Sequence, residues 1–215
     1  RPPDPVGPGL PSAPRPCSLC RVVSCHLRSR FEVPLTFQWV HTNGGPLLLV
    51  TEFLQPSWAG VEAPDPPRLI EATFRFQESG VATDYDRACD AAGGYLGIVS
   101  VGTGQALVLG DVPLQTTWVP QDRGPGGWLV RWEFAESEAD VERTLVDARV
   151  SEWSPGPVFH TVPGNHTLFD AAIPGRDVTD DDTLILHLSA PTYRVSTGFL
   201  RPDPGTSLII HWLQA

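Results

Sequence analysis

Short strand-like segments separated by turn residues dominate this sequence. The clearest is GGWLVRWEFA, residues 126–135. The even-numbered positions from Trp128 to Phe134 are all apolar, whereas Arg131 and Glu133 fall on the opposite face. A period of two is that of a β-strand with one face buried and one face in water. The pattern therefore predicts a half-buried strand.

Further strand candidates recur along the chain. They cover residues 37–41, 46–50, 95–102, 105–110, 116–120, 158–162, 167–172, 183–188, 192–200 and 207–213. Three of the gaps between them contain residues that favour tight turns, namely Asn43-Gly44, Gly102-Thr103-Gly104 and RPDPG at 201–205. We expect hairpins at these three places.

Helix signals are fewer. In DYDRACD, residues 84–90, Tyr85 and Cys89 are four positions apart and would share one helix face, and Asp84 is a candidate cap. A second helix is expected from Ser137, with an apolar stripe that includes Val141. Few helices among many hairpin-joined strands predict an α+β fold with a largely antiparallel sheet.

The N-terminal region differs in composition. Its first 16 positions hold seven prolines, so residues 1–34 are predicted to be a disordered Pro/Arg-rich extension and residues 35–215 a single domain. The extension contains a superficially zinc-like set: Cys17, Cys20, Cys25 and His26. Structural zinc sites usually separate two ligand pairs by a longer loop, so no metal site is predicted there.

The net charge of the chain limits the kinds of macromolecule that it is expected to bind. The formal net charge is −10, and residues 1–30 carry five arginines against Asp4, which leaves −14 on the remainder after +4 is subtracted. Such a surface repels phosphates, so no nucleic-acid partner is expected. It would attract a basic protein, although solubility alone also explains it. No apolar run approaches the roughly 18 residues of a membrane span and no signal peptide is legible, so we expect no membrane association and a cytoplasmic location.

The residues with chemical potential do not form a catalytic pattern. Three aspartates around Cys89 disfavour the thiolate, and helix packing is the expected role of both Cys89 and Tyr85. The histidines are dispersed without metal-ligand spacing, and Asp180–Asp182 lacks the ligand alternation of a calcium loop. We therefore predict no catalytic, cofactor-binding or metal-binding residue and no cofactor.

Two short motifs suggest a family. Trp58-Ala59-Gly60 is a W-x-G motif and Tyr85 to Cys89 is a Y-x-x-x-C motif. In their order and context they resemble the immunity protein 21 family of bacterial polymorphic toxin systems, over about residues 37–213. The family also carries a characteristic arginine, for which Arg87 and Arg131 are the two candidates.

That resemblance implies an α+β protein that binds and neutralises a cognate toxin, with the motif residues either structural or in contact with the toxin. Many toxins of such systems are nucleases, whose basic grooves an acidic inhibitor would suit. The residues themselves are also compatible with two other functional classes. One is a small hydrolase or metal-dependent enzyme that uses dispersed His, Asp and Cys residues, and the other is a general protein-interaction domain.

Overall fold

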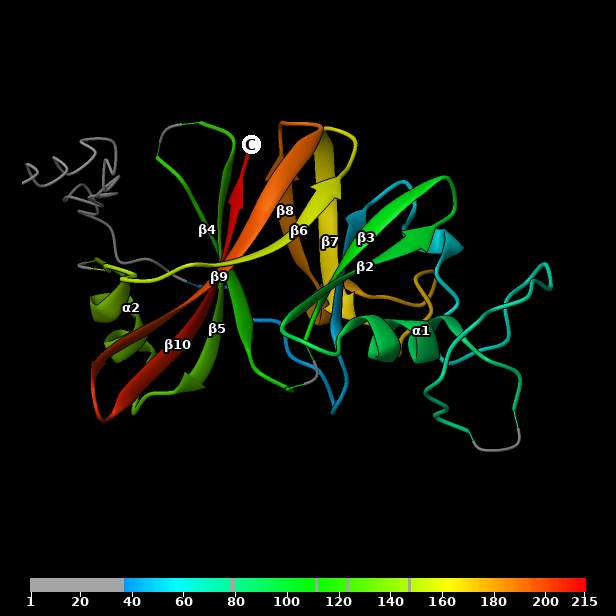
Figure 1. Ribbon diagram of the computed structural model, residues 1–215, viewed down its shortest axis with the longest axis horizontal. Helices are drawn as coiled ribbons and strands as arrows, with labels where there is room; N and C mark the ends of the chain where they lie inside the picture. Colours follow the sequence, from blue (N-terminus) through cyan, green and yellow to red (C-terminus); the bar gives the residue numbers. More distant parts are fainter. Residues whose placement is uncertain (1–36, 78–79, 111, 123, 147) are drawn as a thin grey trace, which may run out of the picture.

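The computed structural model describes residues 37–77, 80–110, 112–122, 124–146 and 148–215. Within these ranges the chain forms ten strands in two antiparallel sheets, with two α-helices (Figure 1). The predicted α+β class is therefore confirmed, with the strands divided between two sheets. The predicted extension at residues 1–34, including its cysteines, lies outside the described residues.

Each sheet has five strands. The order in the first sheet is β2 (Leu96–Val101), β3 (Gly104–Leu109), β1 (Leu47–Thr51), β7 (Gly164–Asp170) and β8 (Leu184–Leu188). The order in the second sheet is β4 (Thr116–Pro120), β5 (Gly126–Phe134), β10 (Thr206–Gln214), β9 (Thr192–Asp203) and β6 (Ser154–His160). The helices are α1 (Asp84–Ala91) and α2 (Glu138–Val146), and the short 3-10 turns are η1 (Gln55–Ser57) and η2 (Asp180–Asp182).

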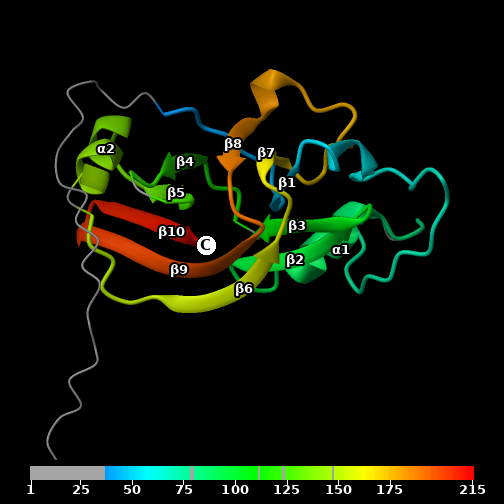
Figure 2. The same ribbon diagram turned by 90° about the horizontal axis from the view of Figure 1, so that it is seen from above.

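The layers run from α1 through the first sheet and the second sheet to α2 (Figure 2). Leu47 and Leu49 of β1 pack between the two sheets, whereas Leu48 and Val50 face the helix α1. Both faces of β1 are thus covered, and this explains why its sequence is a continuous apolar run instead of an alternating one.

The strand β5 is more deeply buried than its alternation predicted. The odd-numbered face was expected to be polar and exposed, but Arg131 is only 1% exposed. That face lies against the other sheet, since Leu129 belongs to the inter-sheet core, while Val130 on the opposite face packs with α2. The half-buried prediction is therefore wrong for residues 127–131, because that part of the strand is covered on both sides, whereas Glu133 is exposed as expected.

Two of the three predicted hairpins are present. β2 pairs with β3, and β9 pairs with β10. The prediction of a hairpin at Asn43-Gly44 is wrong, because the segments on either side of this turn do not pair with each other. Val40 bridges Thr116 of the second sheet, whereas β1 pairs with β3 and β7 of the first. The Asn43-Gly44 turn connects the two sheets, and the Thr42 hydroxyl donates to the carbonyl of Gly45 to close it.

Candidate functional site

The helix α1 begins one residue earlier than the sequence suggested. Thr83, not Asp84, is the N-cap, and its hydroxyl accepts from the amide of Asp86. The Asp86 carboxylate in turn accepts from the Thr83 amide at 2.7 Å, which completes a capping box. The predicted cap at Asp84 is therefore wrong, and its carboxylate is available for another role.

Asp84 lies at the centre of a buried network. Its carboxylate is fully buried and accepts from the Ala59 amide at 2.9 Å. It also accepts from Arg68 Nη2 at 2.5 and 2.6 Å and from Arg87 Nε at 2.8 Å. One carboxylate thus ties together the segment that follows η1, the long loop before α1, and α1 itself. From the sequence, only the Asp84–Arg87 pair of this network was predictable, because residues three positions apart on a helix lie side by side.

The W-x-G motif packs directly against this network. Trp58 is fully buried, its Nε1 donates to the Ala171 carbonyl at 2.8 Å, and the Arg87 guanidinium lies 5.0 Å from its ring centroid. Gly60 has φ +62°, and a Cβ there would lie 2.4 Å from the Ala172 carbonyl oxygen. Only glycine fits this position without strain or a shift of the backbone.

The Y-x-x-x-C motif completes the cluster. The Tyr85 amide donates to the Gly60 carbonyl at 2.9 Å, so the two motifs are joined through the backbone. Burial, and next the neighbouring Cys89, raises the pKa of the Tyr85 hydroxyl. Cys89 is half-buried and packs against the apolar cluster that α1 shares with the first sheet. The Tyr85 ring meets Phe74 and Phe76 edge-on, with centroids 6.5 and 5.4 Å away.

The two remaining aspartates of α1 hold the preceding loop, which projects from the body of the molecule (Figure 1). Asp86 accepts from the Phe76 amide at 2.7 Å, and Asp90 accepts from the Thr73 hydroxyl at 2.7 Å and the Phe74 amide at 2.9 Å. The Thr73 hydroxyl is the main cause of a lowered pKa at Asp90. The acids of DYDRACD are thus loop anchors, a role that sequence reasoning missed.

Arg131 is separate from the other five motif positions. It lies between the two sheets, where its Nη2 donates to the Val112 carbonyl at 2.5 Å. Its neighbour His211 is fully buried and shares a 2.9 Å hydrogen bond with the Thr197 hydroxyl. Burial, and secondarily the charge of Arg131, lowers the pKa of His211 to about 3. The structure therefore brings Trp58, Gly60, Tyr85, Arg87 and Cys89 together and leaves Arg131 apart.

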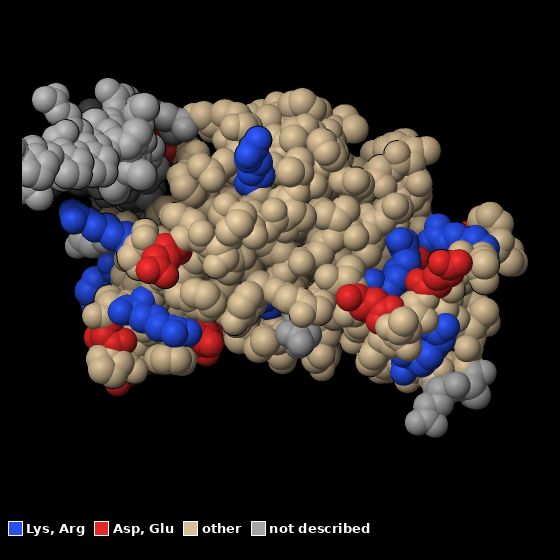
Figure 3. Space-filling model, viewed as in Figure 1, with Lys and Arg blue, Asp and Glu red and all other residues tan. Residues whose placement is uncertain are grey.

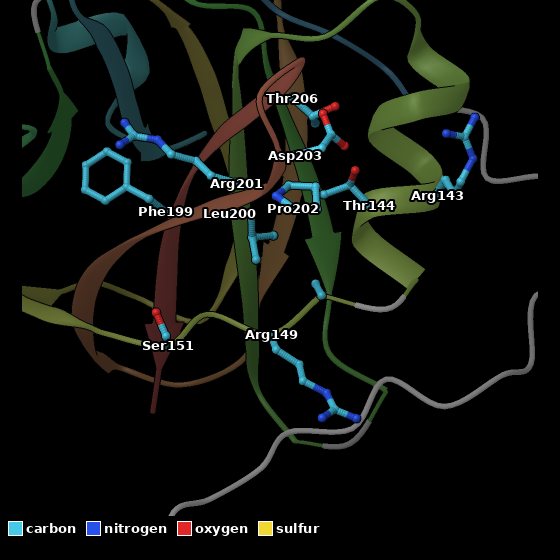
Figure 4. A pocket seen from close by; sticks show the side chains of 11 residues that line it. Arg143, Thr144, Arg149, Ser151, Phe199, Leu200, Arg201, Pro202, Asp203 and Thr206 are labelled. Atoms are coloured by element: carbon cyan, nitrogen blue, oxygen red, sulfur yellow. The ribbon is translucent and has the colours of Figure 1, made fainter.

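A groove of about 620 Å³ between α2 and β9 is lined by three arginines (Figure 4). Their side chains diverge: Arg143 pairs with Asp140 at 2.7 Å, and Arg201 stacks on the Phe199 ring at 4.9 Å. Arg149 points away from both of the others. Three diverging guanidinium groups do not form a bidentate anion site.

The described residues offer neither a metal-ligand cluster nor a membrane-spanning helix. In those ranges no group of three or more His, Cys, Asp or Glu side chains is placed to hold a metal ion. Neither of the two α-helices there has the length and apolar character needed to cross a membrane.

Comparison with known proteins identifies the family. No curated protein and no solved structure matches the chain. The family model described as immunity protein 21 matches residues 38–206, a range that contains both sequence motifs, both α-helices and all strands from β1 to β9. The match covers well over half of the 215 residues, so this chain belongs to the immunity protein 21 family.

Proposed function

We propose that this protein neutralises a cognate toxin by stoichiometric binding and catalyses no reaction. The family match over residues 38–206 is the observation that carries the proposal, since members of an immunity family protect against a toxin. Residues 35–215 act in this proposal as one binding domain in the cytoplasm, where the toxin would otherwise reach its target.

The motif residues are assigned a supporting role in this proposal. Trp58 is fully buried and Tyr85 is 7% exposed, so neither ring offers much area to a partner. The Arg87 guanidinium already donates hydrogen bonds to the Asp84 carboxylate and to the Ser100 carbonyl. Gly60 and Cys89 serve backbone fit and packing. The cluster would thus fix α1 and the projecting loop relative to the first sheet, and Arg131 would join the two sheets.

The charge of the chain favours a basic toxin. A net charge of −10 raises the rate of encounter with a positive surface, and salt screens that effect. Measuring the association rate between about 0.05 and 0.5 M NaCl tests this part: a rate that falls with salt supports it. An association rate that does not change with salt would exclude the proposal that the toxin is basic. It would not affect the proposal that the protein neutralises its toxin by binding.

The direct test is co-expression with the cognate toxin domain, which this proposal expects to be encoded beside the gene. Survival in the presence of this protein, with co-purification as a 1:1 complex, is the expected result. An inactivated toxin serves as the control for the burden of expression. Rescue by substoichiometric amounts, with loss of rescue in Cys89→Ala, would instead favour the rival class of a hydrolase that uses dispersed His, Asp and Cys residues.

A further inference from the structure

The charges of this acidic chain are unevenly placed. Residues 91–110 and 153–169 contain no Asp, Glu, Lys or Arg, although the chain carries 40 such residues (25 acidic plus 15 basic). These two stretches are β2 with β3 and β6 with most of β7. Of these, β6 belongs to the second sheet and β2, β3 and β7 to the first, so the proximity of β6 to β2 and β3 is a property of the fold.

The fold brings the two stretches together. β6 is an edge strand of the second sheet and contacts both β2 and β3 of the first. The approach is close, since a Cβ on Gly156 would lie 3.0 Å from Leu96 Cδ1. We call the resulting exposed surface the neutral face and define it by these side chains: Tyr95, Ser100, Thr103, Val158, His160 and Val162.

Figure 3 shows the same division from outside. Charged side chains gather at the α2 end and at the α1 end of this view, and the surface between them is mostly uncharged, with one basic side chain in its upper part. Exposed Arg194 of β9, the cross-strand partner of Val158, borders the neutral face. Three of the exposed side chains are large and apolar or aromatic: Val162 is 66% exposed, and Tyr95 and Val158 are each 44% exposed.

The neutral face also contains a groove. It has a volume of about 460 Å³ and is lined by residues that include Leu54, Ser100, Gln105, His160 and Val162, none of them acidic or a guanidinium. Among the lining residues, the Gln105 side chain accepts from the His160 amide at 3.2 Å and so links β3 to β6. Hydroxyl, amide and aliphatic groups around a preformed hollow suit an apolar side chain with polar neighbours.

We propose that the neutral face is the surface on which the toxin docks, through a patch of the toxin that is itself poor in charge. The inference rests on the proposed function. Centres of protein interfaces are depleted of charged residues, because burying an ion without a partner is strongly unfavourable. The charged ends of the molecule then form the rim, where they accelerate encounter without being desolvated.

Edge-strand pairing with a second copy is disfavoured as the use of this surface. The exposed edge β6 carries Pro155 and Pro157, which have no amide hydrogen to donate to a neighbouring strand. The partner therefore engages side chains and the groove. The projecting loop is the rival surface, since its Leu69 is 88% exposed, but that loop interleaves acids with arginines.

The test uses the intact protein and its toxin in a binding titration. Val162→Glu and Val162→Arg place either sign of charge at the groove, and Val158→Glu provides a second position. Ile185→Glu and Ile185→Arg are matched controls, because Ile185 is 56% exposed on β8, at the opposite edge of the first sheet from β2. Leu69→Glu tests the projecting loop.

Both Val162 variants and Val158→Glu are expected to raise the Kd at least about tenfold, whatever the sign of the charge, with Ile185 variants within about twofold of wild type. Unchanged urea midpoints show that the variants are folded. Wild-type-like binding by the Val162 and Val158 variants, or opposite effects of Glu and Arg at Val162, overturns the neutral face as the docking surface. Failure of the wild-type protein to bind overturns the proposed function itself.

Discussion

Replacing Asp84 by asparagine tests whether the buried carboxylate organises the motif cluster. The substitution preserves size but removes the charge and replaces one acceptor oxygen by an NH₂ group. That NH₂ group would face donors, because the partners of the wild-type carboxylate among the described residues are the Ala59 amide, Arg68 and Arg87, and all of them donate. At least one donor would lose its partner inside the protein.

The magnitude follows from the exposure of the partners. Removing one member of a buried ion pair costs about 3–5 kcal/mol. The Arg87 side chain is 18% exposed, but the Arg68 side chain is 40% exposed, so solvent screens its pairing and its share is discounted. Asparagine also keeps one acceptor. We therefore expect Asp84→Asn to lower the free energy of unfolding by about 3 kcal/mol, or Tm by about 6–12 °C at this chain length.

Urea denaturation followed by tryptophan fluorescence measures the change. A lower midpoint with an unchanged slope reports a loss of stability without a change in the surface exposed on unfolding. Asp90→Asn on the same helix is the matched control, because the Asp90 carboxylate is exposed and holds only the loop. Equal losses in the two variants would refute the idea that Asp84 is the organising group.

Three further outcomes are expected. Gly60→Ala lowers the urea midpoint, since its Cβ would lie 2.4 Å from the Ala172 carbonyl oxygen, whereas Gly93→Ala, with 3.7 Å to its nearest atom, has little effect. The free energy of unfolding falls as pH drops from about 6.5 towards 3, by up to about 1.4 kcal/mol per pH unit from His211, because the unfolded chain takes up a proton that the folded one excludes. Above pH 6.5 His211 is neutral in both the folded and the unfolded chain, so no stability is lost there. His211→Asn should flatten the slope measured by urea titrations between pH 3 and 6.5, and an unchanged slope would exclude His211 as the cause. Cys89→Ala retains rescue in the co-expression assay, and loss of rescue by a folded variant would contradict the packing role.

Much of the strand pattern was predictable from local signals. The turn residues at Gly102-Thr103-Gly104 and at 201–205 correctly marked two hairpins, because a tight turn fixes its own strand pairing. The Asn43-Gly44 turn carried the same signal but joins strands of different sheets. Turn chemistry determines the local reversal of the chain, and the competition among distant strands decides the pairing.

The candidate site was harder to predict, because it depends on long-range contacts. The i, i+4 spacing correctly placed Tyr85 and Cys89 on one helix, but no local pattern indicated that Asp84 would meet Arg68 and the Ala59 amide. The burial of Arg131 was missed for the same reason, since alternation within β5 does not show that a second sheet covers its polar face. The neutral face likewise arises only when β6 crosses β2.

The central claim is neutralisation by binding, and titrating this protein into a fixed amount of active toxin tests it most directly. The account predicts that residual toxin activity falls linearly and reaches its minimum at one equivalent, with no recovery of chemically altered toxin. Complete inactivation at a small fraction of an equivalent, or covalent change in the toxin, would contradict it.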